Sequence, residues 1–262
     1  MKLFLFVAFC TVSSLALAGQ LSDDTLRQIR FDQKIGAQIP LGAVFRDETG
    51  RSVHLANYFG KKPVVLVLGY YGCPMLCTLV SNGLIESFHD LKSNIGDQFD
   101  VLHVSVSPTE KPALAAAKKR EYLRHYGRPG AEKGWHFLTG DEPAIHELAD
   151  AVGFRYAYDP VAKQYAHPSG FIVLTPQGQV SRYFFGVDFR AEDLSNALHT
   201  ASKNETGSVI RQLFLLCFHY RPITNKYGTL VLDGIRTIGV ATLLALIIYV
   251  TRSFRGERKL RS

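Results

Sequence analysis

Residues 63–78 read Pro-Val-Val-Leu-Val-Leu-Gly-Tyr-Tyr-Gly-Cys-Pro-Met-Leu-Cys-Thr. The β-branched and aliphatic run that ends at Gly69 is typical of a strand buried on both faces. The apolar positions that follow it fit one face of a helix over residues 76–91. The Gly-Cys-Pro turn therefore stands where a buried strand meets a long helix, which is where an open α/β sheet places its ligands.

Outward from this stretch, strand and helix patterns alternate within residues 21–202. Further strands are predicted at residues 101–106, 135–138, 171–175 and 180–185, and helices at 111–126, 141–152 and 192–201. Asp141 is the expected cap of the second of these helices. Because strands alternate with helices and the chain then ends in a hairpin and a helix, we predict one α/β sandwich around a mixed sheet.

Cys73 and Cys77 lie four residues apart, one in the loop and one in the first helical turn. This spacing can bring both sulfurs to one point, and exposure at a helix N-terminus favours the thiolate. Two chemistries follow: reversible disulfide formation, or capture of a soft metal such as Cu(I), zinc or an iron–sulfur centre. The alternative without chemistry is a pair of buried structural cysteines or a static disulfide.

A copper site with two sulfurs needs a third donor, and the chain contains nine histidines. A surface or core role accounts for those on predicted strands and helices: His89, His103, His125, His146 and His199. His167 stands instead in Tyr-Ala-His-Pro-Ser, the loop directly before the predicted strand 171–175. In a thioredoxin-like sheet such a loop faces the cysteine turn, and its proline is often cis. His167 is therefore the candidate third ligand.

The pattern Gly-Tyr-Tyr-Gly-Cys-Pro-Met-Leu-Cys, with a distant loop histidine, resembles the SCO/SenC family of copper chaperones for cytochrome c oxidase assembly. The similarity extends over about residues 35–198. The resemblance implies a thioredoxin-like fold and copper, as Cu(I) and also as Cu(II), held by Cys73, Cys77 and His167. It also implies that a copper donor protein loads the site. The copper, or reducing equivalents, would then pass to the CuA centre of oxidase subunit II or to another cuproprotein.

The alternative is a thiol–disulfide oxidoreductase that keeps the cysteines of a cuproprotein reduced, which needs only Cys73 and Cys77. The chain also departs from the family pattern at four positions. Met75 and Ser107 stand where the family usually has aspartate, and Ala166 and Pro168 flank the histidine. These departures leave the three ligands unchanged.

Both ends of the chain carry signals of membrane topology. Residues 1–18 combine a basic start, an apolar run and small residues, which predicts a secretory signal peptide. Residues 230–251 are mainly apolar and predict a transmembrane helix after a linker and juxtamembrane segment at 203–229. The basic tail 252–262 places the C-terminus in the cytoplasm. We therefore predict a bacterial inner-membrane protein whose main domain lies in the periplasm.

The net charge of +7 belongs to these ends. Lys2 contributes one positive charge and residues 252–262 a net four, which leaves only +2 on residues 19–251. So small a charge excludes a nucleic-acid-binding domain. Cys217 and His219 precede the predicted membrane helix and could form an auxiliary copper site, although an aromatic segment at the membrane interface is the favoured interpretation.

Overall fold

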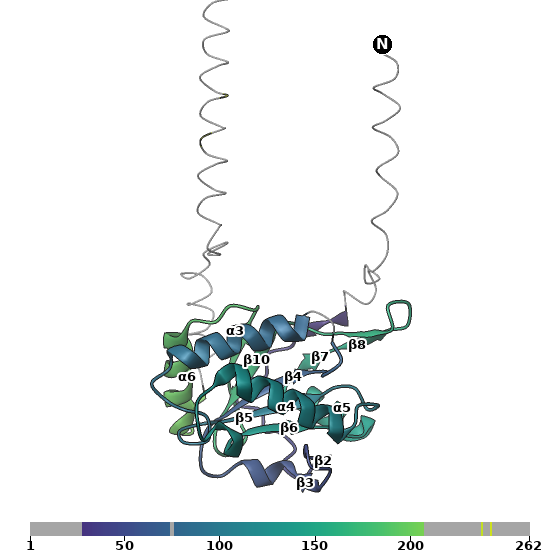
Figure 1. Ribbon diagram of the computed structural model, residues 1–262, viewed down its shortest axis with the longest axis horizontal. Helices are drawn as coiled ribbons and strands as arrows, with labels where there is room; N and C mark the ends of the chain where they lie inside the picture. Colours follow the sequence, from purple (N-terminus) through teal and green to yellow (C-terminus); the bar gives the residue numbers. More distant parts are fainter. Residues whose placement is uncertain (1–27, 74–75, 207–236, 238–241, 243–262) are drawn as a thin grey trace, which may run out of the picture. The chain divides into compact units, whose positions relative to one another are not determined.

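The computed structural model describes residues 28–73 and 76–206, together with the single residues Thr237 and Thr242. The elements described below lie in one compact unit, Met1–Val209. Its centre is a five-stranded sheet in the order β11-β10-β4-β5-β6 (Figure 1). The strands are β4 (Val64–Gly69), β5 (Asp100–Ser105), β6 (Trp135–Leu138), β10 (Gly170–Leu174) and β11 (Val180–Phe185).

The directions of these strands make the sheet mixed. β4 is parallel to β5, and β5 is parallel to β6. β10 runs antiparallel to both of its neighbours, β4 and β11. The predicted α/β sandwich around a mixed sheet is therefore confirmed, with strand bounds close to those expected from the sequence.

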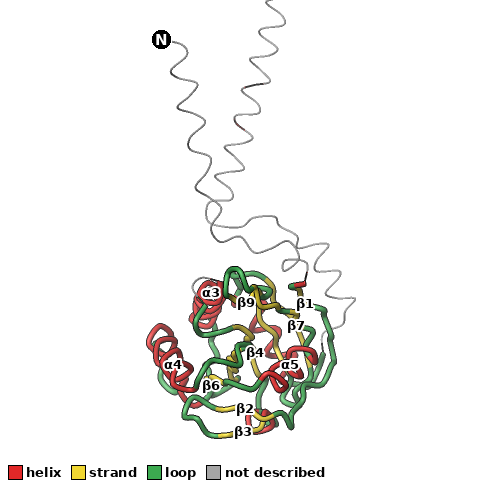
Figure 2. Tube along the Cα trace, turned by 90° about the vertical axis from the view of Figure 1, so that its right-hand side faces the viewer, coloured by secondary structure: helices red, strands yellow, loops and turns green. Residues whose placement is uncertain are grey.

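Helices cover both faces of this sheet (Figure 2). α3 (Leu76–Asp90), α4 (Pro112–Tyr126) and α6 (Ala191–Ser202) pack on one face, and α5 (Glu142–Ala151) packs on the other. Val65 and Val67 of β4 contact the first layer, whereas Leu66 and Leu68 contact the second. A strand covered on both sides has no polar face, which explains the uninterrupted apolar run that began the sequence argument.

The helix starts follow local rules that the sequence already carries. Asp141 lies just before α5 and accepts a hydrogen bond from the backbone N–H of Ala144 at 3.2 Å, which confirms the predicted cap. α4 begins at Pro112, a position where the missing N–H of proline costs nothing. It ends at Tyr126, and the next residue, Gly127, caps the helix with a φ of +67°.

Three small two-stranded sheets were not expected from the sequence. β1 (Arg30–Phe31) pairs with β7 (Phe154–Arg155), β2 (Val44–Arg46) with β3 (Ser52–His54), and β8 (Ala157–Asp159) with β9 (Gln164–Ala166). Strands of two or three residues are too short to show an alternating pattern. Two short 3₁₀ helices, η1 (Leu55–Tyr58) and η2 (Ala131–Lys133), complete the described elements.

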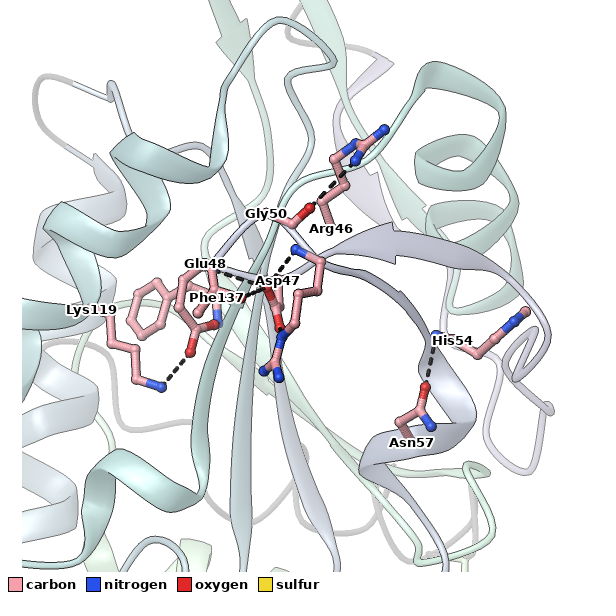
Figure 3. Close-up of polar contacts among 10 residues, drawn as sticks. Arg46, Asp47, Glu48, Gly50, His54, Asn57, Lys119 and Phe137 are labelled. Carbon is pink, nitrogen blue, oxygen red and sulfur yellow. Dashed lines mark hydrogen bonds and ion pairs between the residues drawn. The ribbon is translucent and has the colours of Figure 1, made fainter.

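The turn between β2 and β3 is tied to the main sheet through Glu48 (Figure 3). Its carboxylate accepts hydrogen bonds from Lys119 Nζ of α4 at 2.5 Å and from the backbone N–H of Phe137 at 3.2 Å. Burial alone would raise the pKa of Glu48, but the Lys119 contact and the backbone N–H groups hold this pKa below its ordinary value. The N-terminal hairpin is thereby fixed to the edge of β6.

Among the described residues, no helix has the length and apolar character that crossing a bilayer requires. The predicted signal peptide 1–18 and the basic tail 252–262 lie outside the described residues. The same holds for Cys217, for His219 and for the predicted transmembrane helix 230–251, apart from Thr237 and Thr242.

Candidate metal centre

The cysteine turn leaves the carboxyl end of β4, as the sequence predicted. The chain turns back after Gly69, with the Cys73 N–H donating to the Tyr70 carbonyl at 3.4 Å, and α3 begins at Leu76. Cys73 is partly exposed. Cys77 lies in the first turn of α3, and its side chain lies outside the described part of the chain. Cys73 is therefore a reactive-type cysteine by position rather than a core cysteine.

A carboxylate that sequence analysis did not select holds this turn. Glu110 Oε2 accepts the backbone N–H of Tyr71 at 2.8 Å, and Glu110 Oε1 accepts the backbone N–H of Gly72 at 2.7 Å. Ser105 Oγ, at the end of β5, also donates to Glu110 Oε2 at 2.6 Å. The two residues before Cys73 are thus clamped by one side chain from the neighbouring strand end.

The Tyr71 side chain holds the same turn through hydrogen bonds to the backbones of β5 and β6. Its hydroxyl donates to the Leu138 carbonyl at 2.7 Å and lies 3.1 Å from the His103 carbonyl. Complete burial raises the pKa of Tyr71 well above its ordinary value, so the phenol stays neutral and keeps its proton for this bond. The turn is therefore fixed both through its backbone N–H groups and through a buried side chain.

His167 lies in the loop between β9 and β10, on the same edge of the sheet. Because β10 runs antiparallel to β4, the residues that enter β10 lie beside the residues that leave β4. The His167 ring packs edge-on against the Tyr70 ring, with 6.2 Å between the ring centroids. Both residues line one small cavity of about 20 Å³. The structure therefore brings His167 to the turn that carries Cys73, as predicted.

The environment of His167 fixes its tautomer. The ring is buried, with only 8% exposed, and Nδ1 lies 3.1 Å from the Pro168 carbonyl. A carbonyl only accepts, so in a neutral ring this contact requires the proton on Nδ1, which leaves the lone pair on Nε2. The Phe154 ring packs against the His167 ring, with 5.9 Å between the ring centroids. A neutral imidazole whose second nitrogen is held by a carbonyl is the form in which histidine binds metals.

One expectation about this loop was wrong. The described residues contain no cis peptide bond, so the bond before Pro168 is trans. Trans is the lower-energy form of an X–Pro bond. The loop enters β10 through Gly170 instead, whose φ of +145° lies outside the range of ordinary L-residues.

The donor set is suited to a soft metal. Two thiolates and one neutral imidazole nitrogen match the preference of Cu(I) for sulfur and of copper in general for imidazole. Among the described side chains, no three His, Cys, Asp or Glu residues gather closely enough to hold a metal ion. The predicted set reaches three only with Cys77, whose side chain is not among them.

His103 also lines the cavity beside the cysteine turn, yet its chemistry excludes it as a ligand. Trp135 Nε1–H donates to His103 Nδ1 at 3.0 Å, and an indole N–H can only donate. The neutral ring must therefore carry its proton on Nε2, which leaves no lone pair for a metal. Burial lowers the pKa of His103 to about 3, which keeps the ring neutral. A surface or core role was predicted for His103, and the structure places it in the core.

Residues 40–203 match the family model described as SCO1/SenC. The chain belongs to the SCO1/SenC family. A comparison with curated proteins finds no match. The matched region contains the cysteine turn, the Glu110 clamp and the His167 loop, so the SCO1/SenC segment coincides with the described domain.

Solved structures share the fold of this SCO1/SenC domain. A protein of Aquifex aeolicus VF5, named as a candidate electron transfer protein, is 25% identical with a TM-score of 0.57, covering 68% of this chain and 98% of its own. BsSco, described as a Sco-family cytochrome c oxidase assembly protein with a disulfide switch, is 22% identical with a TM-score of 0.51, covering 65% and 97%. Arabidopsis thaliana ScoI with copper bound is 18% identical with a TM-score of 0.50, covering 65% and 99%. The fold is therefore the mixed α/β, thioredoxin-like Sco fold.

Proposed function

We propose that this protein binds copper through Cys73, Cys77 and His167 and delivers it to the CuA centre of cytochrome c oxidase, or assists assembly of that centre. The observation that carries the proposal is the meeting of the Cys73 turn and the His167 loop at one edge of the sheet, joined by the Tyr70–His167 ring contact. Family membership supports it. Copper bound to Arabidopsis thaliana ScoI supports it by analogy.

Copper is cargo in this proposal, so the residues bind and release rather than catalyse. Cys73 and Cys77 supply thiolates at the start of α3, where the positive end of the helix dipole favours negative sulfur. His167 supplies the lone pair of Nε2 because its Nδ1 proton is directed to the Pro168 carbonyl. The partly exposed position of Cys73 leaves the cargo accessible to a partner. No general acid or base is required.

The proposal includes the membrane topology indicated by the sequence. Residues 1–18 direct export, residues 230–251 anchor the chain in the inner membrane, and the basic tail 252–262 stays in the cytoplasm. The domain then faces the periplasm, where a copper donor protein and oxidase subunit II or another cuproprotein are its partners. Fusion of a reporter enzyme after residue 206 and after residue 262, read for periplasmic and cytoplasmic activity, tests this orientation.

A thiol–disulfide oxidoreductase is the second candidate function, and the partly exposed thiol of Cys73 favours it. The thiolate would attack a disulfide of the partner, form a mixed disulfide and release one partner thiolate. Cys77 would then displace the second, which leaves the Cys73–Cys77 disulfide and a reduced partner. This chemistry does not use His167. The disulfide switch described for BsSco is compatible with either function.

Anaerobic titration with Cu(I) tests the copper proposal. The full chain is purified with Cys10 and Cys217 replaced by serine, so that only two thiols remain. Cys73→Ser, Cys77→Ser and His167→Ala are each expected to weaken binding at least tenfold, because each removes one donor. His125→Ala is the matched control, since that side chain is exposed on α4. Binding as tight in the three site variants as in the control would refute the proposal.

Delivery is tested separately. Copper-loaded protein is mixed with the soluble copper-free domain of subunit II, and formation of the CuA centre is followed by its absorption. If His167→Ala supports assembly as well as the parent while Cys73→Ser does not, the reductase function replaces copper delivery.

A further inference from the structure

The geometry points to Glu110 as the positioning residue of the metal centre: its carboxylate fixes the Cys73 turn and biases the bound copper toward Cu(II) over Cu(I). The inference has two halves: the positioning of the Cys73 turn and the preference for Cu(II), which we call the oxidation-state half. The oxidation-state half rests on the proposed function. The positioning half rests on hydrogen bonds that exist without any metal.

The position of Glu110 follows from the sheet. Gly69 at the end of β4 pairs with Ser105 at the end of β5, and the Val106 N–H donates to the Gly69 carbonyl at 2.7 Å. Parallel neighbours end at the same edge, so the chain that leaves β5 runs beside the cysteine turn. This places Glu110, which precedes α4, opposite the backbone N–H groups of the turn.

Ser105 orients the Glu110 carboxylate. Its hydroxyl accepts the backbone N–H of Ser107 at 3.1 Å and directs its own proton to Glu110 Oε2 at 2.6 Å. With the two N–H groups of Tyr71 and Gly72, both carboxylate oxygens accept hydrogen bonds. Hydrogen bonds from such donors to a carboxylate are charge-assisted and therefore short and strong. Both backbone N–H groups before Cys73 are thus committed to one anionic side chain.

The negative charge of Glu110 is not cancelled by a close cation. Arg46 and Lys111 share an open hollow of about 550 Å³ with Glu110, together with the opposite charge of Asp141. Within the described part of the chain, none of the ion pairs closer than 4.0 Å involves Glu110. The charge therefore acts on its surroundings, which include the turn that carries Cys73.

This charge distinguishes the two oxidation states of the cargo. Two thiolates and a neutral imidazole give a net charge of −1 with Cu(I) and zero with Cu(II). A neighbouring carboxylate repels the negatively charged Cu(I) complex and leaves the neutral Cu(II) complex unaffected. At roughly 10 Å and an effective dielectric constant of about 20, the effect on the ratio of the two affinities is about tenfold. Glu110 thus lowers the reduction potential of the bound copper.

Three variants of the full chain separate charge from position. Glu110→Gln removes the charge and keeps the shape of the side chain. Ser105→Ala removes one hydrogen bond to the carboxylate, together with the hydroxyl's bond to the Ser107 N–H, and keeps the charge. Glu147→Gln is the matched control, because Glu147 is exposed on α5 and makes no ion pair among the described residues.

The first measurement needs no copper. Hydrogen exchange of the Tyr71 and Gly72 backbone amides is followed by NMR in the metal-free protein. Glu110→Gln is expected to speed exchange at one of these two amides at least, by about tenfold, because an amide side chain offers one acceptor oxygen where the carboxylate offers two. Exchange as slow as in Glu147→Gln would overturn the positioning role.

The second measurement is the Cu(II)/Cu(I) midpoint potential of the loaded protein. Glu110→Gln is expected to change the ratio of the Cu(II) and Cu(I) affinities about tenfold. For one electron, this change raises the midpoint potential by about 59 mV. Ser105→Ala should move the midpoint far less. A potential equal to that of Glu147→Gln, or an equal shift in Ser105→Ala, would overturn the charge effect. If the parent binds no copper, the proposed function and the oxidation-state half both fail, while amide exchange alone decides the positioning role.

Discussion

Replacement of Gly170 by alanine is expected to be among the most destabilising single changes near the candidate site. Gly170 is the first residue of β10 and lies three residues after His167. Its φ is +145°, and an added Cβ would lie 2.0 Å from the Phe184 carbonyl oxygen. That oxygen belongs to β11, so the backbone rather than a flexible side chain has to move. Gly170→Ala should therefore separate β10 from β11 at the entrance of the strand.

Gly186 provides the matched control for this change. Its φ of +94° is also positive, but an added Cβ would meet nothing within 4 Å. Gly186→Ala thus carries backbone strain without a steric contact, a cost of about 1 kcal/mol after the gain from a less flexible unfolded chain. Gly170→Ala adds a forced backbone shift to comparable strain, which brings its cost to about 4 kcal/mol. The expected difference between the two variants is about 3 kcal/mol.

Urea unfolding measures this difference, with fluorescence of the single, fully buried Trp135 as the probe. With a slope of about 2 kcal/mol/M, the midpoint of Gly170→Ala should lie roughly 1.5 M below that of Gly186→Ala. Midpoints that agree within about 0.5 M would refute the steric argument. They would show that β10 accommodates a side chain beside Phe184.

Two further predictions concern pH. Burial depresses the pKa of His103 from 6.5 to about 3. The contribution of the neutral His103 ring to stability is therefore present above pH 6.5 and is lost as pH falls toward 3. The loss amounts to about a few kcal/mol. His103→Gln, which keeps an acceptor for Trp135, should flatten this loss in urea unfolding between pH 7 and pH 4, and an unchanged slope would contradict it. The pKa of Glu48 is held below 4.5, so its contribution is present above that pH and is lost below it. Glu48→Gln should cost about 1–2 kcal/mol at pH 7 and less at pH 3.5, and an equal cost at both would argue against the Lys119 ion pair.

The sequence allowed the main sheet and the long helices to be predicted because their patterns extend over many residues. The strand 135–138 was predicted with the bounds that β6 has. The short strands β8 and β9 gave no such signal, although they lead the chain into the His167 loop. Their pairing depends on contacts between segments, which no local pattern records.

Glu110 shows the same limit for the site. Its neighbours in the sequence, Ser107-Pro108-Thr109, indicate only the end of a strand. The clamp on the cysteine turn depends on the β4–β5 pairing, which places Gly69 beside Ser105. A carboxylate shortly after the predicted strand 101–106 was the available signal. His103 is the reverse case, because a surface or core role without metal binding was predicted for it, but the Trp135 hydrogen bond that excludes metal binding was not.

The two halves of the candidate site come from distant parts of the chain, and the pairing of β4 with β10 brings them together. Each half is already held by groups that need no metal: Glu110 holds the Cys73 turn, and the Pro168 carbonyl sets the His167 tautomer. A preorganised site loses little binding energy to rearrangement when its ligand arrives. With His167 as the proposed ligand, metal affinity should therefore depend on the position of β10. A change such as Gly170→Ala should weaken copper binding even where the protein remains folded, because it displaces His167 from the edge that carries Cys73.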